Sequence, residues 1–499
     1  MTNRKWYGRA QALPSLSESV TVTICEKISN LQQSAKADYL KSEFLSKFVS
    51  ADTDPAAVRR SRAIFKWLCT EQGNKSTNER LLNTHEQFNI LPRVSFIRFV
   101  TFCQRLIRDI IGDYPPSDAF IGSFSGGATT SRARTYGHPS YKYLGKQHVT
   151  PRCAELFLDL IEEMPGWFGT VDEFIPELVR GNVMFTVLKK TDIDRVCCKE
   201  PDLNMFVQKG LGSYIRKSLL RVGVNLQDQS INNRLARLGS ISGSLATIDL
   251  SSASDSMARE LVALLLPVHW FTALDAVRSP YTFIDGEEHR NEMFSSMGNG
   301  FTFELESLLF YVLTRAVARF RGVPGIVSVY GDDIICPSEI FEHLEWVLGY
   351  FGFTLNGDKS FSTGDFRESC GGHYKDGFDI TPFYLREPIR DITDVIHMAN
   401  SLRKWALIPG LGVLDADPAV YDLWSYLKSL VPSDLWGGVD TSFKYQLVSN
   451  DLPVNRLQEE SKNSDTGLGG YVHWLNTTWD REKSPGAEPF ENGHELTIE

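Results

Sequence analysis

The feature that most constrains the fold is a short segment in which two apolar stretches are joined by a tight, acidic turn. Residues 326–329 (Ile-Val-Ser-Val) precede the turn at residues 330–333 (Tyr-Gly-Asp-Asp), and residues 334–337 (Ile-Ile-Cys-Pro) follow it. This pattern predicts a β-hairpin, because glycine adopts turn conformations that other residues avoid. The turn would expose two adjacent carboxylates, Asp332 and Asp333, which repel each other unless a cation lies between them. Gly and Asp are also common in ordinary turns, so a metal site requires a third carboxylate from a neighbouring strand.

Asp249 is the candidate for this third carboxylate. It ends the apolar stretch of residues 245–248, which predicts a buried strand. An acid at the end of a buried strand must find a partner, and Mg²⁺ prefers carboxylate oxygens. We therefore expect Asp249 to meet the acidic turn. We also expect Ser254 or Asp255 to cap a following helix over residues 257–266.

A glycine-led polar segment lies between the two acidic segments. Gly298, Thr302 and Glu306 are spaced four apart, and a helix is expected to continue from them to about residue 322. Ser296 precedes this series. The glycines would let a sugar or a base approach closely, although a polar stripe that faces solvent is the simpler interpretation.

Cations flank the acidic segments on both sides. Lys189, Arg195 and Lys199 precede the strand at residues 245–248 and could hold a triphosphate. Lys359 follows an expected helix over residues 341–351 and could donate a proton to a leaving group. A solvated loop lysine is the simpler interpretation of Lys359.

A separate basic window has no acidic residue between positions 119 and 154, and Arg132, Arg134, Lys142 and Lys146 alternate there with aromatic residues. This mixture suits phosphate neutralisation and base stacking along a single nucleic-acid strand. A solvated surface loop is the alternative.

The composition narrows the class of protein. The 499 residues are 42% hydrophobic, which predicts a folded protein of two or three domains. The net charge of -10 disfavours a protein that coats nucleic acid with its whole surface. The eight cysteines show no CxxC spacing and are expected to be reduced. Because no signal segment or membrane span is apparent, we expect a cytoplasmic protein that contacts no membrane.

The order of these segments resembles the motif order of palm-domain polymerases. More specifically, the chain resembles the replicase catalytic (beta) subunit of small single-stranded RNA bacteriophages, the leviviruses. The blocks that carry the resemblance are residues 194–195, 198–205, 228–232, 247–255, 295–307, 330–335 and 366–371.

This resemblance implies an RNA-directed RNA polymerase with an α+β, right-hand fold of fingers, palm and thumb. Asp249, Asp332 and Asp333 would bind two Mg²⁺ ions, with Lys359 also in the catalytic set. The nucleotide would be contacted by a larger group, which comprises Lys189, Arg195, Lys199, Asp255, Ser296, Gly298, Thr302 and Glu306. Template RNA would meet Arg132, Arg134, Lys142 and Lys146. Glu306 departs from the wider polymerase pattern, which often has Asn at this position.

The resemblance also suggests four regions and several partners. Residues 1–118 would form a helical region that contributes to fingers and thumb, residues 119–240 the fingers and residues 241–385 the palm. Residues 386–499 would form the thumb and a polar tail. The partners would be single-stranded RNA, nucleoside triphosphates, the host elongation factors Tu and Ts and in some members a ribosomal protein, in the cytoplasm of an infected bacterium.

Three alternatives remain at this point. A reverse transcriptase would share the palm and the paired acids. An RNA-binding structural or regulatory protein would not need magnesium. A metal nuclease would leave the helix after Gly298 and the triphosphate cations without a role.

Overall fold

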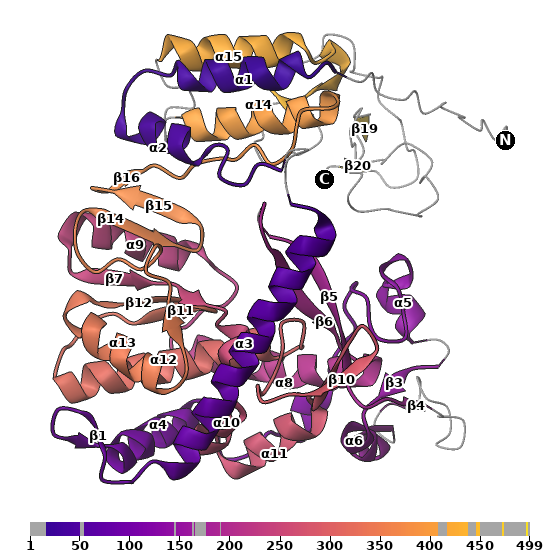
Figure 1. Cartoon of the computed structure of the whole chain (residues 1–499), viewed down its shortest axis with the longest axis vertical. Coiled ribbons are helices and arrows are strands. Elements are labelled where there is room, and N and C mark those ends of the chain that lie inside the picture. The colour runs from indigo at the N-terminus through magenta and orange to yellow at the C-terminus, as the bar shows by residue number, and fades with distance from the viewer. Residues whose placement is uncertain are drawn as a thin grey trace, which may run out of the picture. The chain divides into compact units, whose positions relative to one another are not determined.

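The computed structural model divides the chain into two compact units. It describes residues 16–49, 54–143, 146–161, 164, 176–189, 191–407, 417–437, 446–449, 472–473 and 496–497. The larger unit spans Asp54–Ile380, and the smaller one combines Met1–Thr53 with Thr381–Glu499. The two ends of the chain are thus assigned to the same unit, although the sequence separates them widely (Figure 1).

The larger unit mixes helices and strands. Its helices are α3 (Ala56–Asn83), α4 (Phe96–Ile111), α5 (Pro139–Lys142), α6 (Pro151–Ile161), α8 (Asp202–Arg221), α9 (Ser230–Ser242), α10 (Arg259–Leu265), α11 (Val268–Val277), α12 (Thr302–Arg321) and α13 (Phe341–Tyr350). Its strands are β1 (Asn89–Leu91), β2 (Val94–Ser95), β3 (His148–Val149), β4 (Glu177–Leu178), β5 (Asn182–Leu188), β6 (Asp194–Lys199), β7 (Leu245–Ile248), β8 (Leu250–Ser251), β9 (Tyr281–Ile284), β10 (Glu287–Arg290), β11 (Ser328–Tyr330), β12 (Asp333–Pro337), β13 (Thr354–Leu355), β14 (Phe366–Ser369), β15 (Gly372–Lys375) and β16 (Phe378–Asp379). The expected α+β class is therefore confirmed.

Two sheets position the polar segments found in the sequence. The first is antiparallel with the order β11-β12-β7, and every residue of β7 is buried. The second has the order β10-β9-β5-β6, and the whole of β6 pairs antiparallel with residues 183–188 of β5. A strand that is buried on both faces consists of consecutive apolar residues, which explains why β7 is largely apolar.

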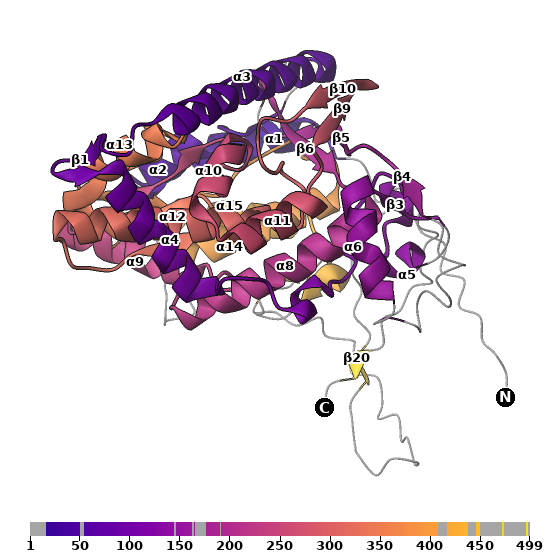
Figure 2. The ribbon, with the colours of Figure 1, turned by 90° about the horizontal axis from the view of Figure 1, so that it is seen from below.

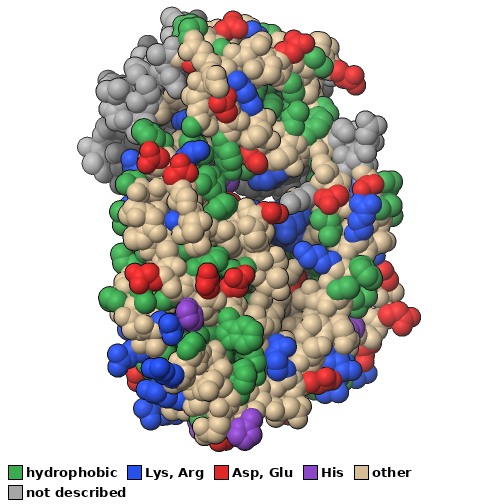
Figure 3. All heavy atoms as spheres, turned by 60° about the vertical axis from the view of Figure 1, so that its left-hand side comes forward, with side chains coloured by type: hydrophobic (Ala, Val, Ile, Leu, Met, Phe, Trp, Pro, Cys, Tyr) green, Lys and Arg blue, Asp and Glu red, His purple; other side chains and the backbone are tan. Residues whose placement is uncertain are grey.

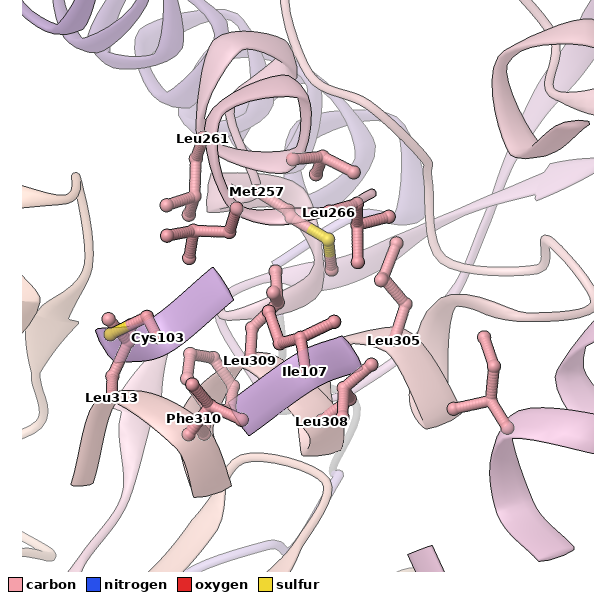
Figure 4. Packing of buried hydrophobic residues seen from close by; sticks show 14 of the residues in the cluster. Cys103, Ile107, Met257, Leu261, Leu266, Leu305, Leu308, Leu309, Phe310 and Leu313 are labelled. Atoms are coloured by element: carbon pink, nitrogen blue, oxygen red, sulfur yellow. The ribbon is translucent and has the colours of Figure 1, made fainter. Parts of the chain in front are cut away.

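The core of the larger unit lies where α12 packs against α4 and α10. Figure 4 shows Leu305, Leu309 and Leu313 of α12 beside Cys103 and Ile107 of α4. All five side chains are fully buried. α12 is buried along most of its length because helices and the first sheet cover it from several sides, so it is the central support beneath the acidic hairpin.

α3 crosses the larger unit as a single long helix (Figure 2). Its first turns meet β6 through the ion pair between Arg59 and Asp194, at 3.1 Å. Its last turns reach α13, where Arg80 Nε donates to the Tyr350 carbonyl at 3.0 Å. α3 therefore ties the second sheet to the helical side of the unit.

The smaller unit is mainly helical. Its elements are α1 (Ser19–Ser29), α2 (Ala35–Glu43), α14 (Ile392–Ala406), α15 (Pro418–Ser429) and the short strands β17 (Trp436–Gly437), β18 (Leu447–Val448), β19 (Val472–His473) and β20 (Leu496–Thr497). Ile24, Leu40, Ile396 and Leu423 are fully buried in one core. The Asp391 side chain begins α14 by accepting from the backbone of Thr393 and Asp394.

Several local predictions can now be compared with the structure. The strand at residues 245–248 and the hairpin around Gly331 are confirmed, and the helix expected at 341–351 is α13. The cap expected from Ser254 or Asp255 is wrong: α10 begins after Ala258 without a side-chain cap, because a 3₁₀ turn over Ser254–Ser256 comes first.

All eight cysteines are free. No helix among the described residues is long and apolar enough to cross a membrane. The four-region division remains a prediction, and most of the polar tail lies outside the described residues.

Candidate active site

The acidic turn has the backbone that the sequence predicts. Tyr330 pairs with Asp333 across the hairpin, and Gly331 has a positive φ of 62°. A side chain at this glycine would also have no room, because its Cβ would lie 2.5 Å from Cε2 of Phe303 on α12. The Gly331 N–H donates to Ser307 Oγ at 3.0 Å. The turn therefore rests directly on α12, and glycine is required there by both conformation and space.

The pairing of β12 with β7 brings the third carboxylate to this turn. Ile334 lies opposite Ile248, so Asp333 and Asp249 take the next position along the two strands. Side chains at such neighbouring positions lie about 5 Å apart at their Cβ atoms. The sequence prediction that Asp249 meets the hairpin is thus borne out by the strand register.

The three carboxylates lie in a partly buried site where their charges oppose one another. Burial raises the pKa of Asp332 above its ordinary value, and the charge of Asp249 raises it further. Burial also raises the pKa of Asp249. For Asp333, burial and then the charges of Asp332 and Asp249 raise the pKa to about 6, although a hydrogen bond from the Cys370 N–H opposes the shift. A group of acids with raised pKa values favours whatever supplies positive charge.

Each outer carboxylate is turned toward a donor of its own. Asn356 Nδ2 donates to Asp249 Oδ2 at 2.6 Å. Asp333 Oδ1 accepts from Ser369 Oγ at 3.1 Å and from the Cys370 N–H at 3.0 Å. As these side chains lie, no three His, Cys, Asp or Glu residues in the described part of the chain close into a metal-binding group. The backbone brings the acids together, and the side chains would have to rotate to share an ion.

Cations face the acids from two directions. The charge of Arg195 on β6 lowers the pKa of Asp332, and that of Lys189 lowers the pKa of Asp249. Lys359 Nζ lies 2.9 Å from Glu368 Oε1. Burial alone would lower the pKa of Lys359, but the hydrogen bond to Glu368 and the nearby acids raise it above its ordinary value.

The basic residues of β6 share one face of the strand. Arg195 and Lys199 are four residues apart, on the side of the strand opposite the buried Asp194 and Val196. Lys199 Nζ lies 5.5 Å from the centre of the Phe185 ring. Arg195 and Lys199 therefore lie on one face of β6, and Arg195 is the one of the two that interacts with an acid of the turn, Asp332.

Two further carboxyl groups lie close behind the acidic turn. Glu306 is 4% exposed, and its Oε2 accepts from Ser254 Oγ at 2.8 Å. Burial and then the charge of Asp332 raise the pKa of Glu306 well above its ordinary value. Burial raises the pKa of Asp255 to about 7. Both groups are therefore placed where a protonated carboxyl is favoured.

The segment before α12 is a packed loop rather than a helical turn. The expected helical stacking of Gly298 on Thr302 and Glu306 is wrong for the glycine, because its φ of 117° is incompatible with a helix. A Cβ on Gly298 would lie 2.2 Å from the Cys198 carbonyl oxygen, so the glycine allows β6 to approach. Thr302 is buried and donates to Ser295 Oγ at 2.9 Å.

A buried glutamate organises this loop. Glu200 is 1% exposed and accepts hydrogen bonds from Asn182, Gln208 and Ser279 at 2.7, 3.0 and 2.7 Å. The same Asn182 side chain donates to Ser296 Oγ at 3.0 Å. Gln208 accepts from the Gly300 N–H at 2.9 Å. Glu200 therefore links β5, α8 and the loop that carries Ser296.

Comparison with known proteins identifies the family. The family described as RNA replicase, beta-chain, matches residues 11–466. The chain belongs to this family. It is 37% identical over 492 residues to the RNA-directed RNA polymerase beta chain of Escherichia phage MS2, with 92% of this chain and 89% of that protein covered. It is 40% identical to the RNA-directed RNA polymerase beta chain of Enterobacteria phage fr, with 89% and 83% covered. The RNA-directed RNA polymerase subunit beta of Escherichia virus Qbeta is also 40% identical, with 86% and 71% covered.

Solved structures show a much weaker likeness to this replicase chain. An RNA-dependent RNA polymerase of BmCPV at elongation state aligns with a TM-score of 0.39 and 10% identity, and covers 80% of this chain and 37% of that one. The family assignment stands on the sequence relatives alone.

Only some of the basic side chains in the window of this replicase chain are exposed. Arg134 is exposed, and Lys146 is exposed and lies 3.1 Å from Glu177. Lys142 is fully buried, and its Nζ donates to the carbonyls of Ser125 and Gly127, both at 2.6 Å. The structure thus gives Lys142 a different place from the predicted RNA contact, because its ammonium holds the glycine-rich loop together.

Arg132 lies beside a pocket that joins this window to the second sheet. The pocket has a volume of about 200 Å³ and is lined by residues 129–133 together with Val183 and Lys199. The basic window and the cations of β6 are therefore neighbours in space, which their separation in sequence does not reveal.

α3 contributes polar residues that the sequence analysis missed. Asn74 Nδ2 donates to the Asp255 carbonyl at 2.7 Å, and Asn78 Nδ2 donates to the Glu292 carbonyl at 3.0 Å. Glu71 accepts from the Met293 N–H at 2.9 Å. The three are buried and spaced at helical intervals of three and four. In the sequence, the helical spacing of these three polar residues is the feature that could have revealed them.

Proposed function

We propose that this chain is the catalytic subunit of a phage replicase, an RNA-directed RNA polymerase that copies a single-stranded RNA genome. The observation that carries the proposal is the meeting of Asp249 with the Asp332–Asp333 turn in a chain of the RNA replicase beta-chain family. RNA synthesis joins a 3′ hydroxyl to a nucleotide and releases pyrophosphate. The site therefore has to manage negative charge on both reacting partners.

Asp249, Asp332 and Asp333 would hold two Mg²⁺ ions. The donor set fits, because all three are hard oxygen ligands, and their raised pKa values support a role for bound positive charge there. Bound magnesium would activate the attacking hydroxyl and neutralise charge on the leaving oxygens. The protein's own part is to hold the backbone of the acids on two paired strands above α12, so that only their side chains would have to rotate to share an ion.

The cations suit the phosphates of the incoming nucleotide. Arg195, Lys199 and Lys189 would bind the triphosphate, since Arg195 and Lys189 already interact electrostatically with the acids. Lys359 is protonated at neutral pH, because its neighbours raise its pKa. It is therefore able to donate a proton to the departing pyrophosphate.

The ribose would be recognised behind the acidic turn. Asp255 would contact its hydroxyls, with Glu306 close by through Ser254. Ser296, for which the sequence predicts the same contact, is buried and bonded to Asn182, and would act by holding the loop. Gly298 and Thr302 would shape the loop without contacting the nucleotide. Gly298 packs against β6, and Thr302 is buried. Arg132, Arg134 and Lys146 would meet the template, and Lys142 would hold their loop.

This function implies an arrangement of fingers, palm and thumb in which residues 241–385 form the palm. The smaller unit would supply the thumb through α14 and α15. The beta-chain names of the relatives suggest that the chain works in a complex, and host elongation factors Tu and Ts and a ribosomal protein are the proposed partners. The site of action would be the cytoplasm of an infected bacterium.

The test is incorporation of labelled nucleotides on an RNA template by the purified full chain, with and without bacterial extract. We expect synthesis that requires magnesium and ribonucleotides. Asp332→Asn should lower the rate by about a thousandfold or more, because a metal ligand is lost, while RNA binding persists. Asp358→Asn, an exposed acid in the nearby loop, is the matched control and should leave the rate unchanged.

Each alternative predicts a different result in the same experiment. A reverse transcriptase would prefer deoxynucleotides. An RNA-binding structural protein would show no synthesis in any condition, and a nuclease would shorten the template. Full synthesis by Asp332→Asn would refute the assignment of the metal ligands.

A further inference from the structure

The larger unit exposes a group of arginines that the proposed site does not use. They lie on α4, in the turn before it and on the last half of α12. We name this group the arginine surface, and its members are Arg93, Arg98, Arg105, Arg315, Arg319 and Arg321. All six side chains are exposed, and no lysine occurs on either helix. The group is therefore built from one residue type.

Aromatic packing shows that the two helices meet at this surface. The ring of Phe320 on α12 lies 5.9 Å from that of Phe99 and 5.5 Å from that of Phe102, both on α4. The Arg98 guanidinium lies 5.4 Å from the centre of the same Phe320 ring. The start of α4 thus lies beside the end of α12. Figure 3, which brings the left side of Figure 1 forward, shows Lys and Arg side chains gathered at the lower left of this face.

These arginines are not neutralised by neighbouring acids. Across the part of the chain that the structure describes, none of the six forms an ion pair, whereas the adjacent Arg108 is paired with Asp113 at 2.7 Å. Asp109 is exposed on the same helix and offsets one charge. The whole chain has a net charge of -10, so this surface is a local reversal of the overall sign.

Helix stability explains only part of the pattern. Arg319 and Arg321 lie in the last turn of α12, where a cation interacts favourably with the helix dipole. Arg98 lies in the first turn of α4, which holds no acidic residue. A cation is unfavourable at that end of a helix. The helix dipole therefore does not explain Arg98.

We propose that the arginine surface binds the sugar-phosphate backbone of RNA outside the active site. Arginine presents a planar fork that can donate two hydrogen bonds to one phosphate, and it is weakly hydrated. Arg319 lies about 20 Å along α12 from Glu306, at 1.5 Å per residue. Arg319 is therefore too far away to touch the nucleotide being added. The arginine surface would hold a flanking stretch of the same strand, and only the choice of RNA as the polyanion rests on the proposed function.

The experiment compares RNA binding by the full chain and by the variant Arg98→Gln/Arg315→Gln/Arg319→Gln, in the absence of nucleotides. Affinity for a single-stranded RNA of several tens of nucleotides should fall about ten- to a hundredfold at 0.1 M salt. The slope of log affinity against log salt should shrink by about 2, at about 0.7 per lost phosphate contact. A short RNA that fills only the active site should bind equally well to both proteins.

The control is a second triple variant, which loses the same number of positive charges outside the arginine surface. Arg234, Arg290 and Arg386 are also exposed, and their replacement by Gln should leave both the affinity and the salt slope almost unchanged. Equal behaviour of the two triple variants would overturn the inference and assign the surface to an acidic protein or to solvent. Because no nucleotides are present, a chain that binds in this way but synthesises nothing would refute the proposed function and leave this inference standing.

Discussion

Two regions of the larger unit bury carboxylates in opposite ways. Glu200 is completely enclosed, and Asn182, Gln208 and Ser279 each donate a hydrogen bond to it. The acidic turn is less enclosed, yet its carboxylates lie against one another and their pKa values are raised by burial and mutual repulsion. In one region burial raises the pKa of the carboxyl group, and neutral hydrogen-bond donors oppose that rise. The other accumulates charge that the described residues balance only partly, through Arg195, Lys189 and Lys359.

This difference separates structural from functional burial. A buried carboxylate with several donors fixes the elements that supply the donors, and costs little while every bond is made. A group of acids that repel one another lowers the stability of the fold unless a bound ligand compensates their charge. Such a group is therefore retained where ligand binding is its function. The same change, carboxylate to amide, should therefore have opposite effects on stability in the two regions.

The largest effect is expected at Glu200. Glu200→Gln places an amide NH₂ against groups that already donate, so a hydrogen bond is lost and a donor is left buried without a partner. We expect the free energy of unfolding to fall by about 4 kcal/mol, measured by urea denaturation. Glu287→Gln, an exposed residue on β10, should change it by less than about 0.5 kcal/mol. If Glu200→Gln were as stable toward urea as the control variant, Glu200 would not be a structural carboxylate, and the distinction between structural and functional burial would fail.

A chain that survives the Glu200 substitution offers a second measurement. Because Asn182 connects Glu200 to Ser296, the variant should lose discrimination between ribonucleotides and deoxynucleotides more than it loses maximal rate. Uniform loss of both would mean that Glu200 supports only the fold.

The two regions also differ in how far the sequence predicts them. Asp249, Asp332 and Asp333 could be found because each stands at the end of an apolar strand, and the pattern of alternating strand and turn is local. The Glu200 network could not be found, because its donors come from β5, α8 and the loop after α11, and no local pattern connects them. The same holds for Asn74 of α3, whose partner is 181 residues away.

Errors in the sequence analysis have a common physical cause. Gly298 was expected in a helix because of its spacing from Thr302, but its φ of 117° serves a close contact with β6 that depends on tertiary packing. The basic, aromatic window predicts that Lys142 contacts RNA, yet two carbonyls of its own loop accept hydrogen bonds from its buried ammonium. Periodicity and charge predict secondary structure and exposure, and tertiary hydrogen bonds override both.

A third carboxyl group, Asp255, should make the stability of the protein depend on pH. Asp255 is more exposed than Glu200, yet burial raises its pKa to about 7, well above the value of an unfolded aspartate. Its contribution to stability is therefore complete below about pH 4 and is lost as the pH rises through about 7. Between pH 5 and pH 7 the magnesium-free protein should lose about 2 kcal/mol from this group. Asp255→Asn should remove this part of the pH dependence, and an unchanged stability profile would count against the raised pKa.

The smallest expected effect is at the acidic turn itself. Asp332→Asn should abolish synthesis and yet raise the stability of the magnesium-free protein by about 1 kcal/mol at pH 7, because one of several repelling charges is removed. Thermal unfolding with and without magnesium measures this difference. Added magnesium should stabilise the unchanged chain more than the variant, since the ion replaces the missing positive charge. A variant that is less stable than the unchanged chain without magnesium would show that Asp332, like Glu200, is held by donors, and the acidic turn would then be a structural feature.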